Sequence, residues 1–129
     1  MSDYKLRSWI KYMTEIKGED YAVSYNSDTH TIICMGSLRL AGKEEYAPIT
    51  ELLDSILIDC PLSIIMDLSH LQFLNSSGIN ILSKFVIQVR QQECVQLTVR
   101  GAINIPWQGK SLKNLQRLMP NLQLEWFSV

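Results

Sequence analysis

The feature that most constrains this chain is the run from Ile64 to Ile79, which reads IIMDLSHLQFLNSSGI. Its apolar first part is typical of a buried strand, and its Ser-Ser-Gly end is typical of a helix start. A helix N-terminus leaves backbone N–H groups unpaired and carries partial positive charge. A serine there can cap the helix, and it is also a favourable position for a phosphate. The run therefore predicts a strand, a short turn and a helix that begins with hydroxyl groups.

Within this run, the motif Asp-Leu-Ser-x-Leu-x-Phe-Leu-Asn-Ser-Ser-Gly-Ile resembles the signature of the STAS domain, in particular that of the small bacterial anti-sigma-factor antagonists. The resemblance extends over residues 63–89, and residues 36–39 match a second family motif in part. It implies that Ser76 is the residue phosphorylated by a partner serine kinase. The family usually has Asp before that serine, whereas this chain has Asn75.

The resemblance implies a phosphorylation-regulated binding protein and not an enzyme. The unmodified form would bind a serine/threonine kinase of anti-sigma type, phosphorylation of Ser76 would release it, and a PPM-type phosphatase would restore binding. We expect the following residues to contact the partner: Asn75, Ser76, Ser77, Gly78, Asn80 and Lys84. One alternative is a constitutive interaction module of a larger signalling or transport assembly, in which Ser76 is only a helix cap. A second alternative is a small enzyme or ligand-binding domain, against which the absence of paired carboxylates, a nucleophile–base set and a phosphate loop argues.

The composition is typical of a single globular domain. The chain has 129 residues, enough for one domain with a core, and a formal net charge of −1. Balanced charge argues against a nucleic-acid partner, and no apolar run approaches the roughly 20 residues that span a membrane. The start lacks the apolar core of a signal peptide, so we expect a cytoplasmic protein. We expect no cofactor, because the sequence has neither metal-ligand spacing nor a phosphate-binding loop. We expect Cys34, Cys60 and Cys94 to be buried reduced thiols.

Hydrophobic periodicity predicts an α/β domain over residues 21–129. A hairpin at residues 21–36 comes first, and helices then alternate with strands, which favours a mixed sheet with parallel strands and helices packed on it. The STAS resemblance implies the same architecture. The expected elements after the hairpin are a helix with Pro48 in its first turn, a strand at 63–67, a helix from Ser76, a strand at 95–99 ended by Gly101, a helix at 111–119 and a strand at 122–127.

Residues 1–20 lie outside the resemblance and are expected to form an amphipathic extension. Its apolar residues fall at helical spacing: Leu6, Trp9, Ile10, Met13 and Ile16. This helix could dock on its own domain, on a second copy in a homo-oligomer, or on a partner.

The remaining polar motifs predict no chemistry. Asp67 and Ser69 are expected to close the strand and shape a turn, with His70 in that turn and His30 in the hairpin. Neither histidine has neighbours with the spacing of metal ligands. Gly109-Lys110-Ser111 matches only the end of a phosphate-binding loop, because the earlier glycine is missing.

Overall fold

A computed structural model describes residues 14–129 as one mixed sheet with helices packed on it. The strands are β1 (Glu15–Lys17), β2 (Tyr21–Asn26), β3 (Thr31–Leu38), β4 (Ser63–Leu74), β5 (Gln96–Ala102) and β6 (Gln123–Phe127). The helices are α2 (Gly42–Ile58), α3 (Ser76–Gln91) and α4 (Gln108–Leu118).

The six strands follow one another across the sheet in sequence order. β1, β2 and β3 pair antiparallel, and β3 to β6 pair parallel. The Asn26 carboxamide closes the β2–β3 hairpin by accepting a hydrogen bond from the Asp28 backbone N–H at 2.9 Å. Each later parallel strand is reached through a helix, as parallel pairing requires. The predicted α/β architecture is confirmed.

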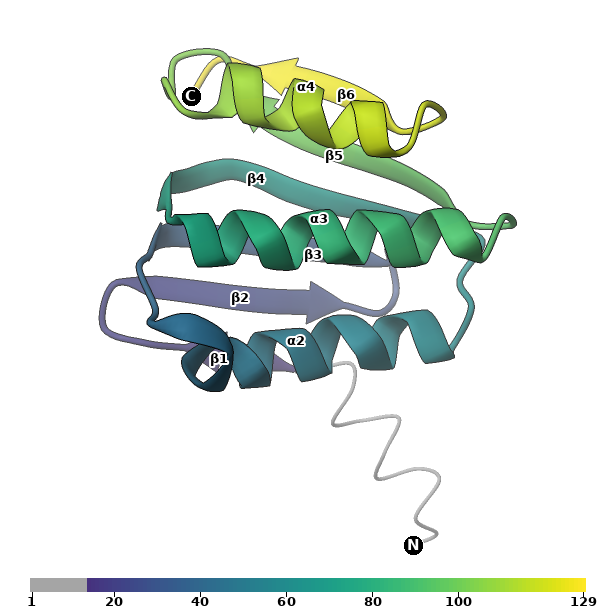
Figure 1. Ribbon diagram of the computed structural model, residues 1–129, viewed down its shortest axis with the longest axis horizontal. Helices are drawn as coiled ribbons and strands as arrows, with labels where there is room; N and C mark the ends of the chain where they lie inside the picture. Colours follow the sequence, from purple (N-terminus) through teal and green to yellow (C-terminus); the bar gives the residue numbers. More distant parts are fainter. Residues whose placement is uncertain (1–13) are drawn as a thin grey trace, which may run out of the picture.

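Helices α2, α3 and α4 lie on the same face of the sheet (Figure 1). The parallel strands are added in sequence order, and crossover connections between parallel strands are right-handed. Each crossover helix therefore packs on the same face of the sheet. Ile56 on α2, Phe85 on α3 and Leu112 on α4 are almost fully buried against the strands. The sheet contributes Val23, Ile32, Ile64, Met66, Leu97 and Val99 to the same core.

Helix α2 begins earlier than its sequence indicates. It starts at Gly42, and Pro48 lies inside the helix and not in its first turn. Pro48 lacks the N–H that would bond to the Glu44 carbonyl, which costs one backbone hydrogen bond. Glu44 and Glu45 occupy the first turn, where acidic side chains stabilise a helix.

Strand β4 continues well beyond Asp67, so Asp67 and Ser69 do not end it and His70 is not a turn residue. The Asp67 carboxylate accepts hydrogen bonds from the Ser69 backbone N–H at 3.0 Å and from the Ser69 hydroxyl at 2.6 Å. The pairing of β3 with β4 shifts register between Ile33 and Met35. Between the pairs Ile33–Asp67 and Met35–His70, β4 has one residue more than β3, which makes a bulge in β4. The strand then continues to the start of α3.

Gly101 lies within β5 and does not end it. A Cβ at this position would lie 2.6 Å from Leu112 Cδ1 and 2.8 Å from the Trp126 ring. The glycine is needed for close packing of α4 and β6, and not for a turn. Helix α4 likewise begins at Gln108 and not at Ser111.

The predicted N-terminal helix does not include Ile16, which lies in β1 opposite Val23. The other residues of that prediction lie outside the described residues: Leu6, Trp9, Ile10 and Met13. Among residues 14–129, no helix is long and apolar enough to cross a membrane.

Candidate functional site

The Ser-Ser-Gly motif lies where β4 meets α3. Ser76 is the first residue of α3 and directly follows the helix cap, Asn75. The Asn75 backbone N–H donates to the Leu38 carbonyl at the end of β3, 3.1 Å away. The start of α3 is thus attached to the segment between β3 and α2, at the edge where the parallel strands end (Figure 1).

Asn75, and not Ser76, caps α3. Its Oδ1 accepts a hydrogen bond from the Gly78 backbone N–H at 3.0 Å and another from the Tyr46 hydroxyl at 2.7 Å. Its Nδ2 donates to the Leu40 carbonyl at 2.8 Å. The predicted alternative in which Ser76 is a plain cap is therefore wrong. The contacts also give a reason for Asn in place of the family's Asp, because a carboxylate has no N–H to donate to Leu40.

The two serines differ in exposure. Ser76 is exposed, and its hydroxyl makes no hydrogen bond to another residue within 14–129. Ser77 is half-buried and lies in a groove between α2 and α3. The first turn of α3 carries no acidic residue of its own that would offset the partial positive charge of this helix end. Ser76 combines an exposed hydroxyl with a local environment that suits added negative charge.

Tyr46 on α2 is a site residue that the sequence motif does not reveal. Its side chain is buried, and burial raises the pKa of its hydroxyl. A Cβ on Gly78 would overlap Leu74 Cδ1 and lie 2.8 Å from the Tyr46 oxygen. Gly78 is therefore buried for packing reasons, and its contact with a partner stays a prediction. The carboxamide of Asn75 likewise binds this chain's own groups.

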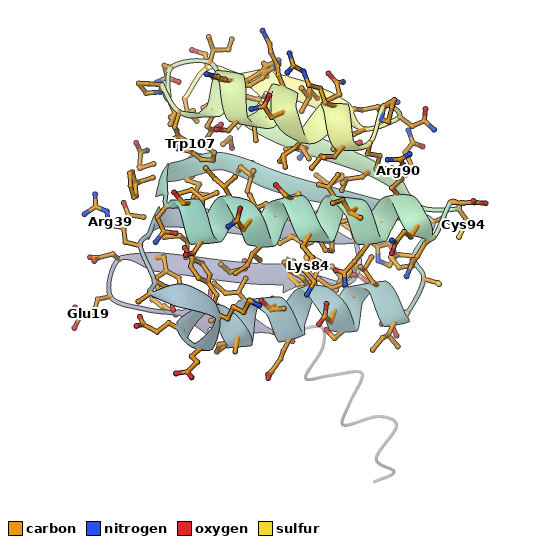
Figure 2. The ribbon with its side chains drawn as sticks, viewed as in Figure 1. Glu19, Arg39, Lys84, Arg90, Cys94 and Trp107 are labelled. Atoms are coloured by element: carbon orange, nitrogen blue, oxygen red, sulfur yellow. The ribbon has the colours of Figure 1, made fainter. Side chains whose placement is uncertain are left out.

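Three of the predicted partner residues, but not Ser76, line a groove between α2 and α3 with a volume of about 420 Å³. Ser77, Asn80 and Lys84 lie on its α3 side, and Figure 2 shows Lys84 on the side of α3 that faces α2. Apolar side chains in its lining are Ala47, Leu53, Ile81 and Phe85. The exposed groups near Ser76 thus border an apolar depression that could accept a partner's side chains.

A second exposed area lies at the ends of the parallel strands. The Arg39 guanidinium stacks 4.7 Å from the centroid of the Phe73 ring, which is 40% exposed. Ile103, after β5, is 69% exposed. Figure 2 places Arg39 at the end of the molecule where α3 begins. Exposed aromatic and arginine side chains of this kind are common in protein interfaces.

Gln108 is a fully buried polar residue that sequence patterns did not single out. Its Nε2 donates to the carbonyls of Leu68 and Leu71, at 2.7 and 3.1 Å, and its Oε1 accepts from the Ala102 N–H at 2.7 Å. These bonds join α4 to β4 and β5. The structure places Gly109, Lys110 and Ser111 inside α4, where they form no phosphate-binding loop.

Asp67, Ser69 and His70 lie together on β4, but not in the order of a catalytic triad. The Ser69 hydroxyl lies between Asp67 and His70, 3.2 Å from His70 Nδ1, so the histidine does not lie between the acid and the hydroxyl as a triad requires. Within residues 14–129, no three His, Cys, Asp or Glu side chains gather as metal ligands.

The cysteines are free thiols in two different environments. Cys34 is buried, but Cys60 and Cys94 are exposed, so the prediction of three buried thiols is wrong for two of them. Burial, with a smaller effect of the Asp67 charge, raises the pKa of Cys34 to about 12. Cys34 is thus a neutral core residue.

The fold is similar to that of several solved proteins. A chain of the crystal structure of diguanylate cyclase SiaD in complex with its activator SiaC, from Pseudomonas aeruginosa, matches with a TM-score of 0.69 at 13% identity, over 88% of this chain and 99% of that one. Apo-SiaC matches with a TM-score of 0.66 at 11% identity over the same shares. An anti-sigma factor antagonist from Mycobacterium paratuberculosis matches with a TM-score of 0.53 at 19% identity, over 88% of this chain and 86% of that one.

The chain has a STAS-like fold. The resemblance read from the motif and the observed architecture agree on this point. No family model and no curated protein matches the sequence. At these low identities the similarity concerns the fold alone, and function has to be argued from the site.

Proposed function

We propose that this chain is a phosphorylation-regulated binding switch. Its unmodified form binds a partner protein through the surface around the start of α3, and phosphorylation of Ser76 releases that partner. The observation that carries the proposal is the division of roles at this helix start. Asn75 provides the cap and the inward hydrogen bonds, which leaves the Ser76 hydroxyl exposed and without a hydrogen bond to any described residue.

The physical effect of the phosphate supports the switch. A phosphate adds roughly −1.5 to −2 charges and three acceptor oxygens. At the first residue of α3 it is compatible with the fold, since it faces the positive end of the helix and replaces no hydrogen bond. In a packed interface the same group adds bulk and a desolvation cost. A loss of about 3 kcal/mol of binding free energy weakens affinity about a hundredfold.

The binding surface in this proposal has two parts. The first is the α2–α3 groove with Ser77, Asn80 and Lys84 along it. The second is the exposed Arg39–Phe73 pair at the strand ends. Following the STAS resemblance, the partner is a serine/threonine kinase of anti-sigma type, and a PPM-type phosphatase reverses the modification.

A second candidate follows from the similar structure in which SiaC is named the activator of a diguanylate cyclase. In this candidate the chain is a constitutive interaction module that regulates an enzyme of a signalling assembly without modification of Ser76. The groove beside α3 would serve either partner. The two candidates differ in whether Ser76 is phosphorylated in the cell.

Mapping of phosphopeptides from cells by mass spectrometry tests the proposal. We expect a phosphopeptide over residues 75–84 with the phosphate on Ser76, and its loss in Ser76→Ala but not in Ser77→Ala. A phosphate retained in Ser76→Ala and lost in Ser77→Ala would move the site by one residue. Absence of the modified peptide under conditions where phosphatase is inhibited would favour the constitutive module.

A further inference from the structure

Two exposed cysteines lie at the end of the molecule where α2 and α3 end, away from Ser76. Cys60 follows the last turn of α2, and Cys94 lies between α3 and β5. Figure 2 shows Cys94 beyond the end of α3, and Figure 1 shows the chain passing from α2 to β4 at that same end. Neither cysteine lines the α2–α3 groove.

The backbone holds together the two segments that carry these thiols. The Gln96 N–H donates to the Leu62 carbonyl at 2.9 Å, and Ser63 pairs with Gln96 where β4 and β5 begin. Neighbouring strands lie about 4.8 Å apart. Cys60 and Cys94 each lie two residues before one partner of this hydrogen bond. The two segments therefore enter the sheet next to each other, with a cysteine on each.

Gln92, the residue that ends α3, contacts both cysteines. The Cys60 Sγ lies 3.8 Å from the Gln92 Oε1, and the Gln92 Nε2 donates to the Leu57 carbonyl of α2 at 3.1 Å. The Gln92 backbone carbonyl accepts a hydrogen bond from the Cys94 N–H. The Cys60 thiol is thus directed from the end of α2 toward the turn that carries Cys94.

We infer that Cys60 and Cys94 form an intramolecular disulfide when the protein meets a small-molecule disulfide such as oxidised glutathione. Disulfides join cysteines whose Cα atoms are about 4.4–6.8 Å apart, a range that suits residues on adjacent segments entering a sheet. One protein thiolate attacks the oxidant, so that a mixed disulfide forms and one small thiol leaves. The other thiolate attacks the protein sulfur of that mixed disulfide, which forms the Cys60–Cys94 bond and releases the second small thiol. Two electrons pass from the protein to the oxidant, and the two thiol protons end on the released thiols.

The bond fastens the C-terminal end of α2 to that of α3. These helices form the walls of the groove described above, with Leu53 and Asp54 on the α2 side and Lys84 and Gln88 on the α3 side. The cross-link therefore fixes the two walls at the end of the groove that is farther from Ser76. In a reducing compartment such a bond is transient and forms under oxidising conditions. Its formation does not depend on phosphorylation of Ser76.

Oxidation of the full chain in glutathione redox buffers tests the inference, with peptide mapping under non-reducing conditions. We expect a cross-linked peptide pair that contains Cys60 and Cys94, in a monomer whose mass falls by two hydrogens. Cys60→Ser and Cys94→Ser should each stop at a mixed disulfide on the remaining exposed thiol. Cys34→Ala is the matched control and should form the bond as wild type does, because Cys34 is buried and burial raises its pKa to about 12.

A comparison with the unfolded chain shows whether the fold brings the thiols together. The ratio of closed to open protein at each glutathione composition gives the effective concentration of one thiol at the other. We expect this concentration to be at least about tenfold higher in the native protein than in urea, where only the chain between residues 60 and 94 joins the thiols. Equal values would overturn the inference. A cross-link between two copies, or mixed disulfides at both cysteines without closure, would also overturn it.

Discussion

At the scale of single residues, the inward hydrogen bonds at the start of α3 come from Asn75 and Tyr46 and do not involve Ser76. Asn75 and Tyr46 bind each other and the backbone of the preceding segments. Ser76 is exposed, and its hydroxyl has no hydrogen bond to a side chain or backbone group of the part of the chain that the structure describes. Because the inward contacts do not involve Ser76, this position can be modified without loss of the cap.

Asn75→Asp should destabilise the protein by about 1–3 kcal/mol, because the Leu40 carbonyl loses its donor and faces a carboxylate instead. Asn80→Asp, an exposed change on the same helix, is the control and should stay within about 0.5 kcal/mol of wild type. Urea denaturation of the three proteins measures both effects. If Asn75→Asp were as stable as wild type, the amide of Asn75 would not be the reason for the departure from the family's Asp.

Gly78→Ala should cost roughly 1–3 kcal/mol, since its Cβ overlaps Leu74 and approaches Tyr46. Gly109→Ala is the matched control, because a Cβ there meets open space in α4. It should leave the free energy of unfolding unchanged or raise it by about 0.5 kcal/mol. Thermal melts of both variants suffice, and a Gly78→Ala protein as stable as wild type would contradict the packing described here.

Single residues also show where sequence reasoning reaches its limit. Ser76 and Asn75 could be located because strand, turn and helix start are adjacent in the chain. The cap could not be assigned, because Asn and Ser both cap well and the choice depends on Tyr46 and Leu40, which are distant in sequence. The burial of Gln108 likewise depends on carbonyls of another strand.

At the scale of elements, the apolar residues of α3 recur at helical spacing and lie on its buried side. Leu82, Phe85, Val86 and Val89 are buried, and Asn80 and Lys84 are exposed. The ends of helices and strands were predicted less well. In the local sequence Pro48 is typical of a helix start and Gly101 of a strand end. In the folded chain Pro48 lies within α2. Gly101 lies within β5, where a side chain would collide with Leu112 of α4.

The two sides of α3 should respond differently to truncation. Leu82→Ala removes a buried side chain and should cost roughly 2–5 kcal/mol of stability. Lys84→Ala should change stability by less than about 0.5 kcal/mol and weaken partner binding, since Lys84 lines the groove. Denaturation curves and a binding titration separate these effects. A Lys84→Ala protein with unaltered affinity would remove the groove from the proposed interface.

At the scale of the whole molecule, the sheet and the helices on one face form a single core that includes an ionisable group. Cys34 packs in this core beside the strands. Its folded pKa of about 12 lies above the ordinary value of 9.0. The unfolded chain therefore loses the thiol proton at lower pH than the folded one.

This difference predicts alkaline destabilisation. The contribution of Cys34 is fully present below pH 9.0 and is lost as pH rises toward about 12. Tyr25 and Tyr46 act in the same direction, because burial raises the pKa of both. Chemical denaturation at a series of alkaline pH values should show a shallower decline for Cys34→Ala than for wild type. Parallel declines would mean that Cys34 does not contribute.

Comparison of partner binding by wild type, Ser76→Ala and Ser76→Asp tests the central claim most directly. The first step is a quantitative pull-down with mass spectrometry from the native source, followed by calorimetry with the identified partner. All three proteins should have stabilities within about 0.5 kcal/mol of each other, because Asn75 is the cap. We expect wild type and Ser76→Ala to bind alike and Ser76→Asp to bind much more weakly. Equal affinity of all three proteins would contradict the switch.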